Sequence, residues 1–238
     1  MKYYIYVSDT KVDMLYAQIP QGIKKKIATE IKIDLKILST TFKDKEKVDD
    51  NTRYSRLNLV VDYIEKHLSV GSIDKPASYF RGVMPMYWGM LDGPNSDGIA
   101  YFGGEDNNNI VVLGGSTNHL LGNQSDKDSG RFSSITFGLI KFFNTYLEQE
   151  RRMDNDNRLL ENLLNDELSF FSSTVKGDNL SKIERISKNI NRDMPFMKLA
   201  HSNLEFMARN LINGEGNMVT GQQVILGTPL YVAFADET

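Results

Sequence analysis

The chain has 238 residues, of which 40% are hydrophobic, 25% charged and 10% aromatic, with a formal net charge of −3 and no cysteine. This composition predicts one folded domain with a sizeable core and excludes wholesale disorder. The lack of cysteine excludes disulfides, thiolate catalysis and zinc–sulfur sites, and it fits a reducing compartment. The N-terminus lacks the pattern of a signal peptide and no apolar stretch is long enough to span a membrane, so we expect a cytoplasmic protein.

The N-terminal quarter combines strand and helix patterns. Tyr3–Val7 is β-prone and is followed by a helical stripe that ends at Pro20. A short helix over 24–30, a strand over 33–38 and a helix that begins after Thr52 come next, and Gly71 follows the last of them. A strand that leads directly into a capped helix is a common start of ligand-binding α/β folds.

The middle of the chain predicts an antiparallel meander. Tyr79–Leu91 is aromatic and β-prone, and the turn cluster 92–97 follows it. The apolar runs Ile99–Phe102 and Ile110–Leu113 flank a polar loop, which is typical of a hairpin.

The later part of the chain predicts helices followed by one returning strand. Helical spacing of apolar residues occurs over 132–146, 159–168, 180–190 and 200–211, and the segment 222–235 is β-prone. We therefore predict one domain, 1–238, of α+β or α/β class. Its sheet of about five to seven strands is built mainly from 1–122, the helical part 131–213 packs on that sheet, and strand 222–235 returns to it.

Three stretches carry a resemblance over nearly the whole chain. They are YYIYVSDTKVDMLYAQIP at the start, YFRGVMPMYWG with YFGG and VVLGGSTNHLLG in the middle, and VILGTPLYVAFAD at the end. Together they resemble an uncharacterised bacterial family, common in actinobacteria, that is known only as a domain of unknown function. The resemblance implies a cytoplasmic bacterial single-domain protein and brings no activity with it.

The first candidate site is the start of the predicted N-terminal helix, formed by Ser8, Asp9, Thr10 and Lys11. Free backbone N–H groups and a lysine at such a position suit a phosphate or a ribose. The alternative is an N-cap in which Ser8 or Asp9 accepts from backbone N–H groups. No dinucleotide-binding or P-loop glycine motif is present.

The second candidate is the loop after the hairpin, with Gly114, Gly115, Ser116, Asn118 and His119. Adjacent glycines allow the backbone to approach a ligand, and a histidine titrates near neutrality. The alternative is a glycine bulge with an exposed histidine.

The third candidate is Arg81 with Tyr87 and Trp88, which suit a phosphate and a stacked base. The alternative is an aromatic strand face packed into the core. The histidines are isolated and no metal motif occurs, so we predict no metal site and assign no cofactor.

Three functions remain open at this level. The leading hypothesis is a sensor-like module for a small polar ligand, phosphate-bearing or nucleotide-like. The second is a hydrolase or transferase that uses His119 as general acid–base, with Asp9 or Ser116 assisting. The third is an interaction protein that docks a partner or a second copy through its helical half. A membrane is excluded as a partner, and nucleic acid is disfavoured because acidic residues interrupt the lysine strip of Lys24–Lys36.

Overall fold

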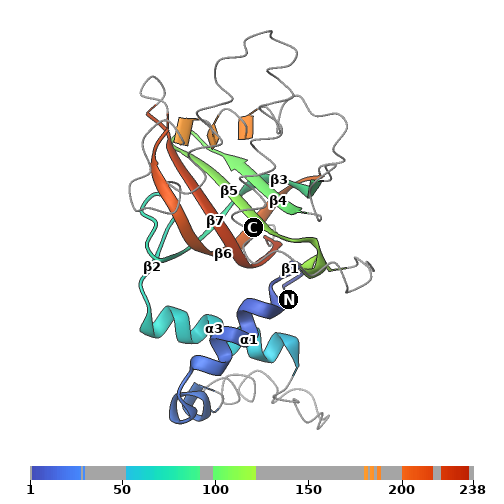
Figure 1. Ribbon diagram of the computed structural model, residues 1–238, viewed down its shortest axis with the longest axis vertical. Coiled ribbons are helices and arrows are strands. Elements are labelled where there is room, and N and C mark those ends of the chain that lie inside the picture. The colour runs from blue at the N-terminus through green and yellow to red at the C-terminus, as the bar shows by residue number, and fades with distance from the viewer. Residues whose placement is uncertain are drawn as a thin grey trace, which may run out of the picture. The chain divides into compact units, whose positions relative to one another are not determined.

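The computed structural model describes residues 2–27, 29, 52–91, 99–121, 180–181, 183–184, 187–188, 200–216 and 221–235 (Figure 1). The chain divides into two compact units, one formed by Met1–Val7 with Gly71–Thr238 and the other by Ser8–Val70. The predicted strand 33–38 and the predicted helices 132–146 and 159–168 lie outside the described residues.

The smaller unit is helical. It contains α1 (Asp9–Gln18), a helical stretch over 21–27, and α3 (Arg53–His67). The side chain of Thr52 caps α3 by accepting from the backbone N–H of Ser55 at 3.2 Å. The apolar stripe of α3 buries Leu57, Val60 and Ile64, as its helical spacing predicts.

The larger unit is a closed β-barrel. Its strands are β1 (Tyr4–Val7), β2 (Val70–Gly71), β3 (Tyr79–Leu91), β4 (Ile99–Glu105), β5 (Asn109–Ser116), β6 (Ala200–Glu215) and β7 (Gln223–Phe234), and the 3₁₀ turn η2 (Thr117–His119) follows β5. β3, β4 and β5 form the antiparallel meander that the sequence predicts. β7 pairs in parallel with β5, and β6 pairs antiparallel with both β7 and β3, which closes a ring of five strands.

The connectivity of this ring is a Greek key. Three consecutive strands are followed by a fourth, β6, that returns by a long connection to lie beside the first of them. Five-stranded Greek-key barrels are the architecture of the OB-fold. Figure 1 shows the long strands β6 and β7, in orange and red, curving around the green pair β4 and β5.

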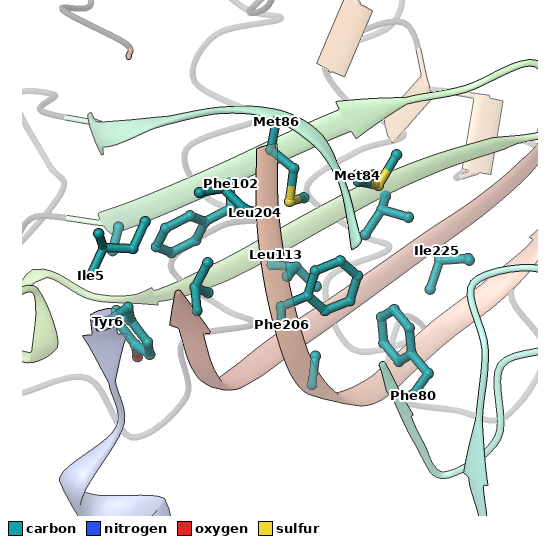
Figure 2. Packing of buried hydrophobic residues seen from close by; sticks show 14 residues of the cluster. Ile5, Tyr6, Phe80, Met84, Met86, Phe102, Leu113, Leu204, Phe206 and Ile225 are labelled. Atoms are coloured by element: carbon teal, nitrogen blue, oxygen red, sulfur yellow. The ribbon is translucent and has the colours of Figure 1, made fainter. Parts of the chain in front are cut away.

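Alternate residues of the strands fill the barrel interior. Figure 2 shows these side chains converging from all five strands, with Ile5 and Tyr6 of β1 at one end and Phe80 and Ile225 toward the other. Phe80 of β3 and Phe206 of the neighbouring strand β6 make an edge-to-face contact with ring centroids 5.6 Å apart. The core thus depends on strand periodicity, in which every second side chain points inward.

The prediction of a helical half packed on an α+β or α/β sheet is wrong. The segment 200–211, predicted as a helix, belongs to the longest strand, β6. Leu204, Phe206 and Ala208 point into the core cluster at every second position, and the intervening residues face outward. The described residues of 180–188 are helical, as predicted. Within the described part of the chain, no helix is long and apolar enough to cross a membrane.

Candidate functional site

The outside of the barrel has two contrasting surfaces. On β4, β5 and β7 the outward residues are themselves buried, and they include Tyr101, Ile110, Val112, Val224 and Leu226. The helical residues of 180–188 pack on this side, where the Tyr101 and Ser187 hydroxyls are 3.2 Å apart. Burial raises the pKa of the Tyr101 phenol, and the hydrogen bond with Ser187 opposes part of that rise. This covered side is therefore a second packing layer.

A polar cluster fastens 180–188 to one end of the barrel. The Lys188 ammonium donates to Glu184 and to Gln222, each at 2.9 Å, and lies 3.6 Å from Glu105. The Gln222 amide donates in turn to Glu105 and to the Asp106 carbonyl. These groups satisfy one another, so we read the cluster as a structural clamp.

The outward face of β3 and β6 is open. Phe80, Met84 and Met86 point into the core, so the odd-numbered residues of β3 point out, and three of these, Arg81, Val83 and Pro85, are exposed. On β6 the outward residues His201, Asn203 and Arg209 are exposed and Glu205 is half-buried, whereas Met207, which lies opposite Arg81, is fully buried. We call this surface, Tyr79–Tyr87 with His201–Arg209, the open face.

A pair of aromatic rings lies at one end of the open face. Tyr87 and His201 are directly opposite each other in the β3–β6 register, and their ring centroids are 4.6 Å apart with an interplanar angle of 54°. Tyr87 is half-buried and His201 is exposed. The pair offers a planar ligand group an aromatic platform.

Two arginines lie toward the other end of the open face. Arg81 is an outward residue of β3, and Arg209 lies opposite Tyr79. Burial raises the pKa of the Tyr79 phenol, and the nearby positive charge of Arg209 opposes that rise. Guanidinium groups on an exposed surface suit phosphate and carboxylate oxygens, which they bind in a bidentate manner.

The acid on the open face is already paired. Glu205 forms an ion pair with Lys2 and accepts from the Tyr231 hydroxyl at 2.9 Å. Within the open face Arg81 and Arg209 stand against Glu205, so the formal charge of this surface is +1, whereas that of the chain is −3. The open face therefore differs in sign from the molecule as a whole and favours anionic ligands.

The structure separates the three members of the predicted arginine–aromatic site. Arg81 and Tyr87 lie on the open face, but Trp88 points inward and packs against the core cluster. Its ring meets Phe234 edge-on at 6.1 Å. For Trp88 the alternative of an aromatic packed into the core is the observed one.

The predicted glycine loop is mostly strand. Gly114 and Gly115 belong to β5 and are buried, and the Gly114 carbonyl accepts from the Thr228 hydroxyl at 3.0 Å. Ser116 caps η2 by accepting from the backbone N–H of Asn118 at 3.3 Å. The His119 ring lies edge-on to Tyr6 with centroids 5.9 Å apart. The contribution of these residues to ligand binding stays a prediction.

The start of α1 belongs to the smaller unit. Ser8 occupies the N-cap position but its side chain makes no capping hydrogen bond, so the capping interpretation is wrong for this hydroxyl. Asp9 forms an ion pair with Arg53 at 2.6 Å, which ties α1 to α3. Burial lowers the pKa of Lys11 to about 8. A role for Ser8, Asp9, Thr10 and Lys11 in phosphate binding stays a prediction.

Sequence reasoning missed His201 and Arg209 as site residues. Both lie in the segment 200–211, for which the spacing of apolar residues predicts a helix, and a helix there does not place them beside β3. The alternation of apolar and polar residues over 203–206 is the signal that identifies the strand. No group of three or more metal-ligating side chains occurs among the residues that the structure describes.

The fold and the site define a small five-stranded barrel protein with one outer surface covered and one open, cationic and aromatic. The chain belongs to DUF7019, a family of unknown function, which matches residues 2–236. This membership confirms the resemblance to an uncharacterised family. No curated protein and no solved structure matches the chain.

Proposed function

We propose that the protein binds a phosphate-bearing or nucleotide-like ligand on the open face and acts as a sensor-like module in the cytoplasm. The observation that carries the proposal is the presence, on one exposed surface, of the Tyr87–His201 ring pair and of Arg81 and Arg209. A planar base suits the ring pair and an anionic phosphate suits a guanidinium. Arg81 is six positions from Tyr87 on β3, about 20 Å at the rise of an extended strand, so a mononucleotide uses one of these two ends and a longer ligand uses both.

Electrostatics support the same choice. In a chain of formal charge −3, a surface of charge +1 attracts anions more than the rest of the molecule does. Because Glu205 is occupied by Lys2 and Tyr231, it opposes an anion less than a solitary carboxylate would. The lack of cysteine, which suits a reducing compartment, supports the cytoplasmic part of the proposal.

Isothermal titration of the full chain with ATP, GTP, cyclic mononucleotides and inorganic phosphate tests the proposal. We expect at least one nucleotide to bind and the double variant R81A/R209A to bind it about 10- to 100-fold more weakly, since the loss of one charged hydrogen bond to the phosphate costs about 1.5–3 kcal/mol. The matched control is K25A/K26A, which removes two exposed cations from the smaller unit. If the folded protein binds no nucleotide, or if R81A/R209A binds as tightly as the unaltered chain, the proposal fails.

A further inference from the structure

The last part of β6 continues beyond the end of β3. From Ala200 to Arg209, β6 pairs with β3, whereas the residues after the bulge at Leu211 pair with β7 alone. Among the residues that the structure describes, the last backbone bond on the β3 side is the one that the Asn210 N–H donates to the Ser78 carbonyl at 3.0 Å. We call the segment 211–215 the β6 edge. No described residue hydrogen-bonds its outer side, so it presents backbone groups that can pair with another strand.

Alternate residues of the β6 edge direct their backbone toward β7 and away from it. The Gly216 N–H donates to the Gln222 carbonyl at 2.9 Å, so Gly216 and, two positions earlier, Gly214 bond toward β7. Asn213 and Glu215 therefore turn their N–H and C=O groups outward, and both residues are exposed. The segment contains neither proline nor lysine, which commonly protect an open strand edge from pairing.

The two exposed side chains of the β6 edge are complementary hydrogen-bonding groups. The Asn213 amide oxygen accepts from the Asn210 amide at 2.7 Å, so the Asn213 amide nitrogen is left to donate. The Glu215 carboxylate is an acceptor, and no described residue forms an ion pair with it. Gly214 lies between this donor and this acceptor and has no side chain. Leu180 occupies the space in which its Cβ would stand.

We propose that a second copy of the chain pairs with the β6 edge in antiparallel orientation, with a two-fold axis at Gly214. In this register Asn213 of one copy lies opposite Glu215 of the other, and the symmetry repeats this pair on the other side of the axis. The opposed residues exchange backbone hydrogen bonds, and the amide donates to the carboxylate. The two glycines meet at the axis as a pair without hydrogen bonds, where the Cα atoms approach to about 4.5 Å and side chains would crowd.

The β6 edge favours a second copy over an unrelated peptide because it is complementary to itself. A donor and an acceptor on either side of a glycine place unlike groups opposite each other when the segment pairs with its own copy, and no like charges meet. The contact is short, so we expect a weak, reversible dimer with a dissociation constant of about micromolar size. The pairing does not depend on ligand binding, because the open face ends at Arg209.

Sedimentation velocity of the full chain over about 5–500 μM, a range that spans a micromolar dissociation constant, tests the inference. We expect a monomer–dimer equilibrium. N213D places two carboxylates opposite each other, and E215K places an amide donor opposite an ammonium. Each variant should weaken dimerisation by about 5- to 100-fold, since the two-fold axis makes every cross-strand pair count twice. N203D is the matched control, because it makes the same substitution where β6 has a strand on both sides, and it should leave dimerisation unchanged.

An equimolar mixture of N213D and E215K tests the register. In the mixed dimer the new carboxylate lies opposite the new ammonium at one end, and Asn213 lies opposite Glu215 at the other. We therefore expect the mixture to dimerise at least as tightly as the unaltered chain, although neither variant does so alone. A monomeric unaltered chain over the whole range overturns the inference. So does a dimer that both variants leave intact, or a mixture that stays monomeric while each variant keeps the circular dichroism of the unaltered chain.

Discussion

Gly115→Ala is the substitution that most sharply separates packing from ligand binding at the end of β5. A Cβ at this position overlaps the Tyr6 phenol oxygen and lies within 2.7 Å of Tyr6 Cε2. Carbon atoms in protein cores are normally about 3.5–4.0 Å apart. Tyr6 is fully buried, and its ring is held edge-on between Phe102 at 5.7 Å and His119 at 5.9 Å, so it has little room to move. Figure 2 shows Tyr6 beside Phe102 at this end of the core.

Overpacking of this kind costs about 1–3 kcal/mol. In a chain of this length each kcal/mol lowers the melting temperature by about 2–4 °C, so we expect a drop of about 2–12 °C. Chemical unfolding followed by the fluorescence of Trp88, the single tryptophan, reports directly on the barrel. Gly22→Ala is the matched control, because its Cβ meets nothing within 4 Å. If Gly115→Ala unfolds at the same denaturant concentration as the unaltered chain, Gly115 has no packing role. That result would support the prediction of an adaptable ligand-binding loop instead.

Three further substitutions test separate parts of the structure. Trp88→Ala should lower the free energy of unfolding by about 2–4 kcal/mol, since the side chain packs on the core. Tyr87→Ala on the open face should lower it by less than about 1 kcal/mol. If unfolding followed by circular dichroism gives similar losses for the two variants, the assignment of Trp88 as inward and Tyr87 as outward is wrong. Lys11 has a lowered pKa of about 8 in the folded state against 10.5 unfolded, so the unfolded state binds more protons between these values and stability rises with pH across that window. Lys11→Met should therefore be more stable by up to about 3 kcal/mol at pH 7, and a gain that does not shrink from pH 8 to 10.5 would show that burial of the charge is not its cause. Tyr101→Phe should cost about 1 kcal/mol by leaving the buried Ser187 hydroxyl unpaired, and urea unfolding should show part of this loss recovered in the double variant with Ser187→Ala.

Elements with a clear local pattern were predictable from the sequence. Thr52 at the N-cap and the stripe of Leu57, Val60 and Ile64 define α3, and the structure has the helix there. The meander follows from its turn cluster and apolar runs, and β7 from an apolar segment without charges. Each of these depends on neighbours within a few residues, and local periodicity reports such neighbours well.

β6 was not predicted because its apolar residues satisfy two periods. Ala200, Leu204, Met207 and Leu211 fit a helical stripe, but Leu204, Phe206 and Ala208 also alternate as in a strand. Pairing with β3 on one side and β7 on the other decides in favour of the strand. That pairing is tertiary information, which outweighs the local pattern.

Only the β3 residues of the open face could be predicted from the sequence, for the same reason. Arg81 and Tyr87 were identified by residue type, and alternation along β3 could have placed them on one face, opposite to Trp88. Their partners His201 and Arg209 become neighbours only through the β3–β6 register. Gly115 illustrates the converse, since a glycine that suggested a flexible loop instead makes room for the buried ring of Tyr6.

The most direct test of the binding proposal is amide chemical-shift mapping of the full chain during titration with the nucleotide that binds most tightly in the calorimetric panel. The open face and the covered side of the barrel are then compared in one experiment. We predict shift changes over residues 79–87 and 201–209 and little change over residues 109–113 of β5. Changes confined to β5 or to the smaller unit, or no changes at all, would contradict ligand binding on the open face.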